Sequence, residues 1–190
     1  MRSIVCETPE QIRMAQALRY EVYCLEKEWI EPSSCDGGLE VDEYDELAVH
    51  FLVFDDESEM VLGTSRLLLG SCQTLPGESF LDLEALGLQP AQTCEVSRLA
   101  SLRASRAPNF EVFLLLMHEM SVWVADFDIV AALSVADVPL HRMMSRIGMP
   151  FMAVGEPVEY LGSECIPSVI DVAGFSALVV RVREARLKKV

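Results

Sequence analysis

One alternating segment in the middle of the chain, Glu95 to Ser101, constrains the fold most. Its period of two predicts a strand, with residues 94, 96, 98 and 100 on one face and 95, 97, 99 and 101 on the other. Glu95 and Arg98 are its only charged residues, and a regular strand would point them to opposite sides. They can serve one site only if the strand contains a β-bulge between them. The alternative is an ordinary strand whose two charges are each satisfied by a partner.

Hairpin patterns before this strand, and alternating strands and helices after it, predict an α/β sandwich around a mixed sheet. The chain has no repeat, low-complexity tract or linker, so we expect one domain over residues 1–190. Thr8-Pro9-Glu10-Gln11 has the residues of a helix start. The patterns predict helices at 9–24, 80–86, 110–125, 138–147 and 173–187, and strands at 4–6, 49–55, 60–69, 94–101, 129–135, 151–154, 158–161 and 168–172.

A long loop is expected at 25–48, and it ends in the acidic run Glu40 to Glu46. Arg19 falls on the apolar stripe of the first helix, where a buried guanidinium needs a carboxylate partner. The acidic run could supply that partner for Arg19 and Arg66, a cation site, or a contact for a substrate amine. A solvated acidic loop is the alternative.

Charge and composition exclude several classes of protein. The net charge of −15 argues against nucleic-acid binding, and no apolar run reaches the roughly 20 residues of a membrane span. The six cysteines form no Cys-x-x-Cys pair and the three histidines are dispersed, so no metal or tightly bound cofactor is expected. Reduced thiols and the lack of a signal-peptide pattern favour the cytoplasm.

Five motifs follow one another at characteristic spacing: Arg19-Tyr20-Glu21-Val22-Tyr23, Trp29, Asp42-Glu43-Tyr44-Asp45, Gly63-Thr64-Ser65-Arg66-Leu67 and Glu95-Val96-Ser97-Arg98. Together they resemble the acyl-homoserine-lactone (autoinducer) synthases and their relatives, the long-chain N-acyl amino acid synthases and the exosortase-associated acyltransferases. The resemblance covers residues 19 to about 160. It implies a GNAT-like (acyl-CoA N-acyltransferase) αβα sandwich with a mixed, bulged and splayed central sheet.

The resemblance also implies an acyl transfer. An amine attacks the acyl thioester on the phosphopantetheine of acyl carrier protein and becomes an amide. The acceptor is an amino acid in one branch and S-adenosylmethionine in the autoinducer branch, where a lactone then closes. Leu99 stands where autoinducer synthases usually have an aromatic residue, and Leu75-Pro76-Gly77-Glu78 looks more like the other branch. These departures favour an N-acyl amino acid synthase, with an autoinducer synthase as the alternative.

Residue roles carry over from the resemblance as expectations. Catalysis falls to Glu95 as general base, with Ser97 and Arg98, and to a backbone N–H freed by the bulge as oxyanion donor. Substrate binding falls to Arg19, Tyr23, Trp29, Asp42, Asp45 and Arg66. The acyl chain would pack on Phe113, Met117 and Met120 of an apolar helix, although plain core packing is the alternative.

The expected partner is acyl carrier protein. The segment 102–108 lacks the glycines with which ordinary superfamily members cradle the pyrophosphate of coenzyme A. Four arginines, which would give a locally basic face on an acidic chain, are expected to meet phosphopantetheine or the acidic carrier: Arg103, Arg106, Arg142 and Arg146. A non-catalytic acidic binding module on the same fold is the further alternative.

Overall fold

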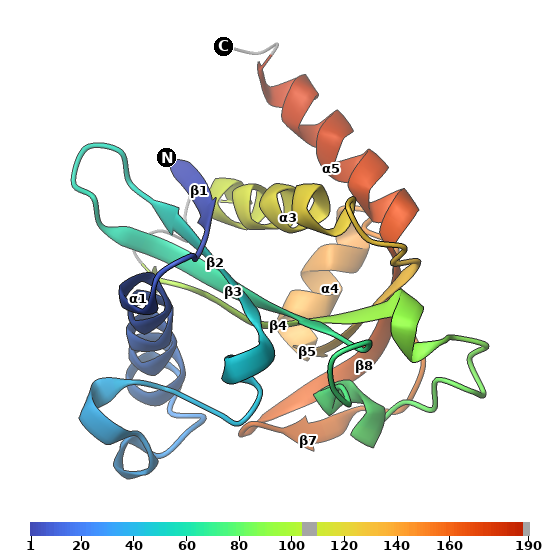
Figure 1. The fold of residues 1–190 in the computed structure, drawn as a ribbon, viewed down its shortest axis with the longest axis horizontal. Coiled ribbons are helices and arrows are strands. Elements are labelled where there is room, and N and C mark those ends of the chain that lie inside the picture. The colour runs from blue at the N-terminus through green and yellow to red at the C-terminus, as the bar shows by residue number, and fades with distance from the viewer. Residues whose placement is uncertain (104–109, 188–190) are drawn as a thin grey trace. The chain divides into compact units, whose positions relative to one another are not determined.

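The computed structural model describes residues 1–103 and 110–187 (Figure 1). The chain divides into two compact units, residues 1–67 with 97–120 and residues 68–96 with 121–190. Strands β3 (Val61–Leu69) and β4 (Thr93–Ser101) each contribute residues to both units.

The first unit places a helix on an antiparallel group of strands. Strand β1 (Arg2–Val5) pairs antiparallel with β2 (Val49–Phe54), β2 pairs antiparallel with β3, and β4 follows β3. Helix α1 (Pro9–Tyr20) packs beside β2 (Figure 1). Between them, the long loop contains only short 3₁₀ turns: η2 (Pro32–Ser34), η3 (Asp36–Gly38) and η4 (Asp45–Leu47).

The start of α1 confirms the sequence prediction. The Thr8 hydroxyl accepts the Gln11 N–H at 3.2 Å, and the Gln11 side chain accepts the Thr8 N–H at 3.1 Å. The helix then continues as one π-helical segment, η1 (Glu21–Glu26). Its inner side joins Leu18, Val22 and Tyr23 in a buried cluster with Ala100 of β4.

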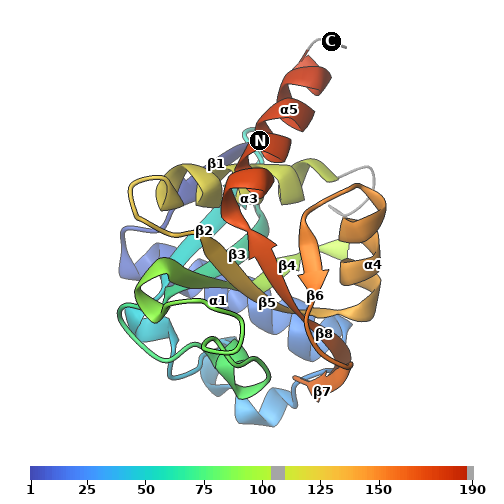
Figure 2. The same cartoon turned by 90° about the vertical axis from the view of Figure 1, so that its right-hand side faces the viewer.

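The second unit holds the mixed part of the sheet. The first residues of β4 pair parallel with β5 (Ala131–Asp137), and β5 pairs antiparallel with β8 (Ser163–Asp171). Strands β6 (Phe151–Ala153) and β7 (Val158–Tyr160) pair antiparallel with different stretches of β8. Helix α4 (Val138–Arg146) packs against β5, β8 and β6 (Figure 2), and helix α5 (Val172–Leu187) follows β8 directly.

The predicted helix at 80–86 is wrong. This segment follows the 3₁₀ turn η5 (Pro76–Ser79) and precedes η6 (Pro90–Gln92), and it forms only turns. Asp82 caps a single turn by accepting the Ala85 N–H at 3.1 Å. Gly87 then adopts a positive φ of 68°, which ends the turn before a helix can propagate.

Helix α3 (Phe110–Val124) confirms the predicted apolar helix and approaches β3 at a glycine. A Cβ on Gly63 would lie 2.4 Å from Val112 Cγ1, so only a residue without a side chain permits this approach. Within residues 1–103 and 110–187, no helix combines the length and hydropathy that crossing a membrane requires.

Candidate active site

Six charged side chains of the first unit, five of them buried and one half-buried, form a closed ring in which arginines and carboxylates alternate. Three regular elements supply the cations, α1, β3 and β4, and the loop before β2 supplies all three anions. Each charge therefore lies between two charges of opposite sign. In order around the ring the members are Arg19, Glu40, Arg98, Asp42, Arg66 and Asp45, which contacts Arg19 again.

Bidentate geometry joins several of these pairs. Arg19 donates from Nη1 and Nη2 to the two oxygens of Asp45 at 2.8 and 3.0 Å. Arg66 donates to both oxygens of Asp42, and its Nη1 also lies 2.6 Å from Asp45 Oδ1. Arg98 donates from Nε to Glu40 at 3.1 Å and from Nη2 to Asp42 at 2.7 Å. Such planar guanidinium–carboxylate pairs are the strongest ion pairs that proteins form.

The ring is nearly sealed from water. The side chains of Arg19 and Arg66 are 0% exposed, and Asp42 has the most exposed acid side chain at 14%. Burying one unpaired charge costs several kcal/mol, so each member depends on its two neighbours. The ring as a whole carries no net charge, which explains how six charges can share the interior of a small unit.

The pKa values follow from this compensation. Burial alone would raise the pKa of Asp42, but the Arg66 hydrogen bond and the charges of Arg98 and Arg66 outweigh it and lower that pKa. Burial likewise opposes the hydrogen bond and charge of Arg19 and the charge of Arg66 at Asp45, whose pKa is strongly lowered. Both aspartates are therefore ionised throughout the neutral range.

Strand β4 has an unusual backbone conformation at Arg98, the end of the stretch in which the sequence predicted a β-bulge, and the bulge itself stays a prediction. Arg98 has a φ of +52°, a left-handed conformation that is rare for a residue with a side chain. Side chains bind the backbone around it: Ser65 Oγ donates to the Ser97 carbonyl at 3.5 Å, and Tyr23 Oη donates to the Leu99 carbonyl at 3.0 Å. The Ser97 hydroxyl accepts from Arg66 Nε at 3.2 Å. The contacts of the ring thus stabilise the left-handed backbone of β4 at Arg98, and that backbone in turn positions the Arg98 side chain in the ring.

Two aromatic residues of the predicted substrate site lie together in the first unit. The rings of Tyr23 and Trp29 stack with centroids 5.8 Å apart, and Trp29 is only half-buried. The backbone N–H of Trp29 donates to the Tyr23 carbonyl at 2.9 Å, which fixes the start of the long loop against η1. Burial raises the pKa of Tyr23, so its hydroxyl remains a neutral donor.

Glu95 lies on the part of β4 that belongs to the second unit, and its side chain is 1% exposed. Its Oε2 accepts the Gly77 N–H of η5 at 2.7 Å. A Cβ on Gly77 would come within 3.0 Å of this oxygen, so glycine allows the close approach of the backbone. The backbone of the Leu75–Glu78 segment therefore fixes one carboxylate oxygen of the predicted general base through the Gly77 N–H.

The remaining predicted residues fall into three groups. Arg103 is exposed in the first unit, and Arg142 and Arg146 are exposed one turn apart on α4 in the second. Arg106 lies outside the residues that the structure describes. On α3, Met117 and Met120 are buried and Phe113 is half-buried, and Met120 Sδ lies 3.3 Å from Ser65 Oγ. Their roles toward a carrier and an acyl chain stay predictions.

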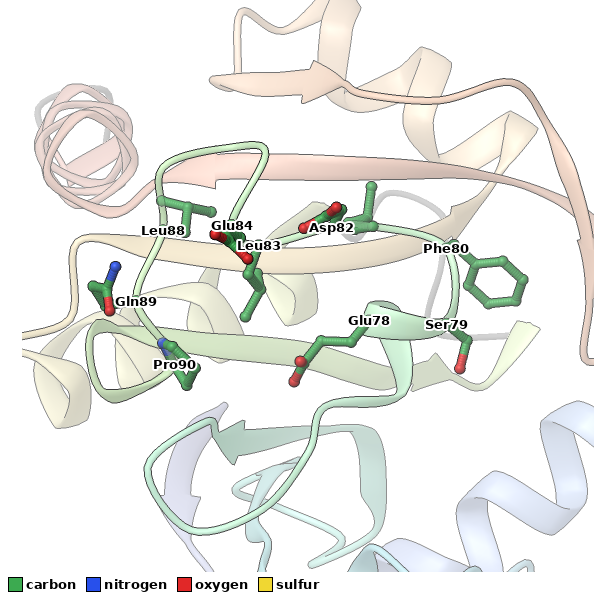
Figure 3. Close-up of a pocket in the computed structure, with 10 residues that line it drawn as sticks. Glu78, Ser79, Phe80, Asp82, Leu83, Glu84, Leu88, Gln89 and Pro90 are labelled. Atoms are coloured by element: carbon green, nitrogen blue, oxygen red, sulfur yellow. The ribbon is translucent and has the colours of Figure 1, made fainter.

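A pocket of about 810 Å³ lies in the second unit, along the loop from Glu78 to Pro90. Figure 3 shows the labelled carboxylates Glu78, Asp82 and Glu84 on the same loop as Phe80 and Leu88. Three acidic side chains make a poor wall for an alkyl chain. This pocket therefore does not match the apolar tunnel that a long acyl group needs.

Two residues of the ring region were not among the predicted site residues, although Glu40 belongs to the acidic run that the sequence offered as a partner for Arg19. Glu40 joins Arg19 to Arg98, and its backbone N–H donates to the Gln16 carbonyl at 3.1 Å. His50 is 1% exposed, and its Nε2 lies 3.4 Å from the Asp45 carbonyl. Glu40 could have been suspected from counting, since three buried arginines need a third acid besides Asp42 and Asp45.

Comparison with protein families matches residues 18–115 to the acetyltransferase (GNAT) domain. The chain belongs to the GNAT family. The matched residues include the whole ion ring, both aromatic residues and Glu95. The mixed sheet with its flanking helices agrees with the GNAT-like sandwich that the sequence predicted.

Individual proteins that this chain resembles are acyl-homoserine-lactone synthases and an N-acyl amino acid synthase. An acyl-homoserine-lactone synthase of Rhizobium radiobacter is 29% identical over 173 residues, which cover 86% of this chain and 76% of the relative. Two solved structures share the fold at lower identity. BjaI, a CoA-dependent acyl-homoserine-lactone synthase with SAM and isopentyl-CoA, has 22% identity and a TM-score of 0.71, covering 92% and 83% of the two chains. FeeM, an N-acyl amino acid synthase from uncultured soil microbes, has 18% identity and a TM-score of 0.70, covering 93% of each chain.

The ring predicts that Glu40→Gln destabilises the first unit although it hardly changes shape. The substitution leaves three buried arginines with two carboxylates, so we expect a loss of about 3 kcal/mol in the free energy of unfolding. Denaturant titration measures this loss. Glu46→Gln, at an exposed acid of the same loop, is the matched control and should change stability by less than about 0.5 kcal/mol. Equal stability of the two variants would contradict the ring as described.

His50 predicts a pH dependence of stability. Burial lowers its pKa, so below about pH 6.5 the unfolded chain binds a proton that the folded chain does not. The free energy of unfolding should therefore fall as the pH drops from 7 to 5, by up to about 1.4 kcal/mol per pH unit. Asp42 and Asp45 do not contribute there, because their lowered pKa values lie below this range. Denaturant titrations of wild type and His50→Gln should differ in this slope, and parallel slopes would refute the assignment.

Proposed function

We propose that this protein is an N-acyltransferase that moves a long-chain acyl group from acyl carrier protein to the amine of an amino acid. The observation that carries the proposal is the ring of three arginines and three carboxylates in a GNAT chain, five of whose six members lie in the motifs shared with autoinducer synthases and N-acyl amino acid synthases. Acyl-homoserine-lactone synthesis from S-adenosylmethionine is the second candidate, and the 29% identical relative favours it.

The ring supplies the positioning part of this mechanism. It fixes the loop of Asp42 and Asp45 against α1, β3 and β4, and thereby orders the wall on which the acceptor would rest. Asp42 is its most exposed acid, so it is the member best suited to contact the acceptor's ammonium group. Trp29, half-buried on Tyr23, supplies an apolar surface in the same unit.

Glu95 supplies the proton chemistry in this proposal. An amine attacks a thioester only when it is neutral, and the Glu95 carboxylate takes its proton directly or through water. The Gly77 N–H holds one carboxylate oxygen in place. A backbone N–H of the bent stretch from Val96 to Leu99 stabilises the oxyanion, with Ser97 and Arg98 shaping that stretch. The thiol of the donor leaves with a proton as the amide forms.

The donor is an acyl thioester, carried in this proposal by acyl carrier protein. Exposed arginines suit an acidic carrier protein: Arg103 in the first unit, and Arg142 and Arg146 in the second. The proposed role of Arg106 rests on the sequence alone. BjaI is a CoA-dependent synthase, so coenzyme A is the alternative carrier. The buried Met117 and Met120 and the half-buried Phe113 are the proposed contacts of the acyl chain.

A product assay tests the proposal. The protein is incubated with palmitoyl-carrier protein or palmitoyl-CoA, and with each amino acid or S-adenosylmethionine in turn. Mass spectrometry then separates an N-acyl amino acid from an acyl-homoserine lactone. We expect the amide with one or a few amino acids, and with the carrier-protein thioester rather than the CoA thioester. A lactone from S-adenosylmethionine would establish the second candidate, and no product in any arm would favour a non-catalytic binding module.

Two substitutions separate positioning from proton transfer. Asp45→Ala should abolish acyl transfer because it opens the ring and removes one of the two carboxylate partners of Arg19 and of Arg66, and it should also lower the unfolding midpoint. Glu95→Gln should leave the fold intact and reduce kcat by about 10²–10⁴-fold. Asp36→Ala, at an exposed acid of the same loop, is the control and should keep full activity. A folded and fully active Asp45→Ala protein would refute the role of the ring.

A further inference from the structure

Two cysteines of the first unit lie in contact outside the ion ring. The sulfurs of Cys24 and Cys35 are 3.6 Å apart, and 11 positions separate the residues in the chain. Cys24 lies in η1 and is 2% exposed, whereas Cys35 follows η2 in the long loop and is half-buried. A disulfide needs a sulfur separation near 2.05 Å, so the two thiols need only a small movement to bond.

The two thiols differ in access to solvent. Cys35 is half-buried in a stretch whose flanking residues, 31–34 and 36–37, are exposed, so of the two thiols it is the one nearer to solvent. Cys24 has no such access, and burial raises the pKa of its thiol. This arrangement of one accessible sulfur and one sheltered sulfur in contact is the one in which an oxidised cysteine is resolved within the same chain.

We propose that Cys24 and Cys35 form a reversible redox site that a hydroperoxide converts to a disulfide. The site goes beyond acyl transfer and does not depend on the proposed function.

The chemistry balances with hydrogen peroxide as the oxidant. The Cys35 thiolate attacks one peroxide oxygen, the O–O bond breaks, and Cys35 becomes a sulfenic acid while hydroxide leaves and takes up the thiol proton as water. The Cys24 sulfur then attacks the Cys35 sulfur. The S–S bond forms, the S–O bond breaks, and a second water carries away the Cys24 proton. Two thiols have lost two electrons to one peroxide, and a dithiol reductant reverses the change.

The disulfide would close a short loop around the aromatic part of the site. The closed segment contains Trp29, which stacks on Tyr23, and it ends five residues before Glu40 of the ring. Closing it removes freedom from the unfolded chain and ties Cys35 of the long loop to η1. Oxidation is therefore expected to stiffen the stretch that carries Trp29.

The experiment uses the full-length protein with Cys72→Ser, because Cys72 is the fully exposed thiol and would otherwise cross-link separate chains. Reduced protein is treated with stoichiometric hydrogen peroxide, denatured, alkylated and analysed by intact mass and peptide mapping. We expect the loss of two hydrogen atoms, a Cys24–Cys35 linked peptide, and full reversal by dithiothreitol. The oxidised protein should unfold at a midpoint at least about 5 °C higher than the reduced protein.

Two matched variants complete the test. Cys24→Ser and Cys24→Ala in the same background should trap a sulfenic acid at Cys35, detected with a dimedone probe, and should form no intramolecular disulfide. The proposal is overturned if peroxide leaves both thiols of the parent protein free to alkylate, if Cys35 goes only to sulfinic acid, or if the linked peptide contains another cysteine. A lowered unfolding midpoint after oxidation would also overturn it, because the bond would then oppose the native fold.

Discussion

The alternation of charge around the buried ring is the constraint on which the first unit depends. Each guanidinium and carboxylate of the ring is too costly to bury alone, and each becomes acceptable only between two partners of opposite sign. Since the three carboxylates come from one loop and the three guanidinium groups from α1, β3 and β4, this requirement fixes the path of a loop that has little regular structure of its own. In this loop, pairing of opposite charges fixes the path of the backbone, whereas elsewhere in the fold apolar packing does so.

Most of the fold could be predicted from the sequence because its elements have strong local signals. The capping residues Thr8 and Gln11, the alternation around Glu95 and the apolar run of α3 each produced the expected element. The predicted helix at 80–86 failed because its apolar spacing resembles a helix, whereas Asp82 and Gly87 limit it to one turn. Local pattern does not show where a turn fails to propagate.

The sequence indicated which residue types form the site better than it indicated which arginine pairs with which carboxylate. Arg19 on an apolar helix face demanded a carboxylate, and the acidic run offered several. Nothing in the sequence distinguishes Glu40 from the exposed Glu43 and Glu46, because the choice depends on how the loop bends over Gln16 and Arg98. A β-bulge between Glu95 and Arg98 was expected only as a condition for a shared site, and the left-handed backbone at Arg98 was not predicted. Local propensity disfavours it, and only the contacts of the folded chain make it acceptable.

The spread of the ring along the chain has a kinetic consequence. Arg98 lies 58 positions from Glu40, and Arg66 lies 24 positions from Asp42, so the loops between them must close before these contacts can form. Closing those loops costs chain entropy, so we expect these contacts to form after the hairpin of β2 and β3 and the helix α1 have assembled. Energy gained after the transition state slows unfolding without speeding folding. We therefore expect the ring chiefly to lower the unfolding rate and so to prolong the lifetime of the native state.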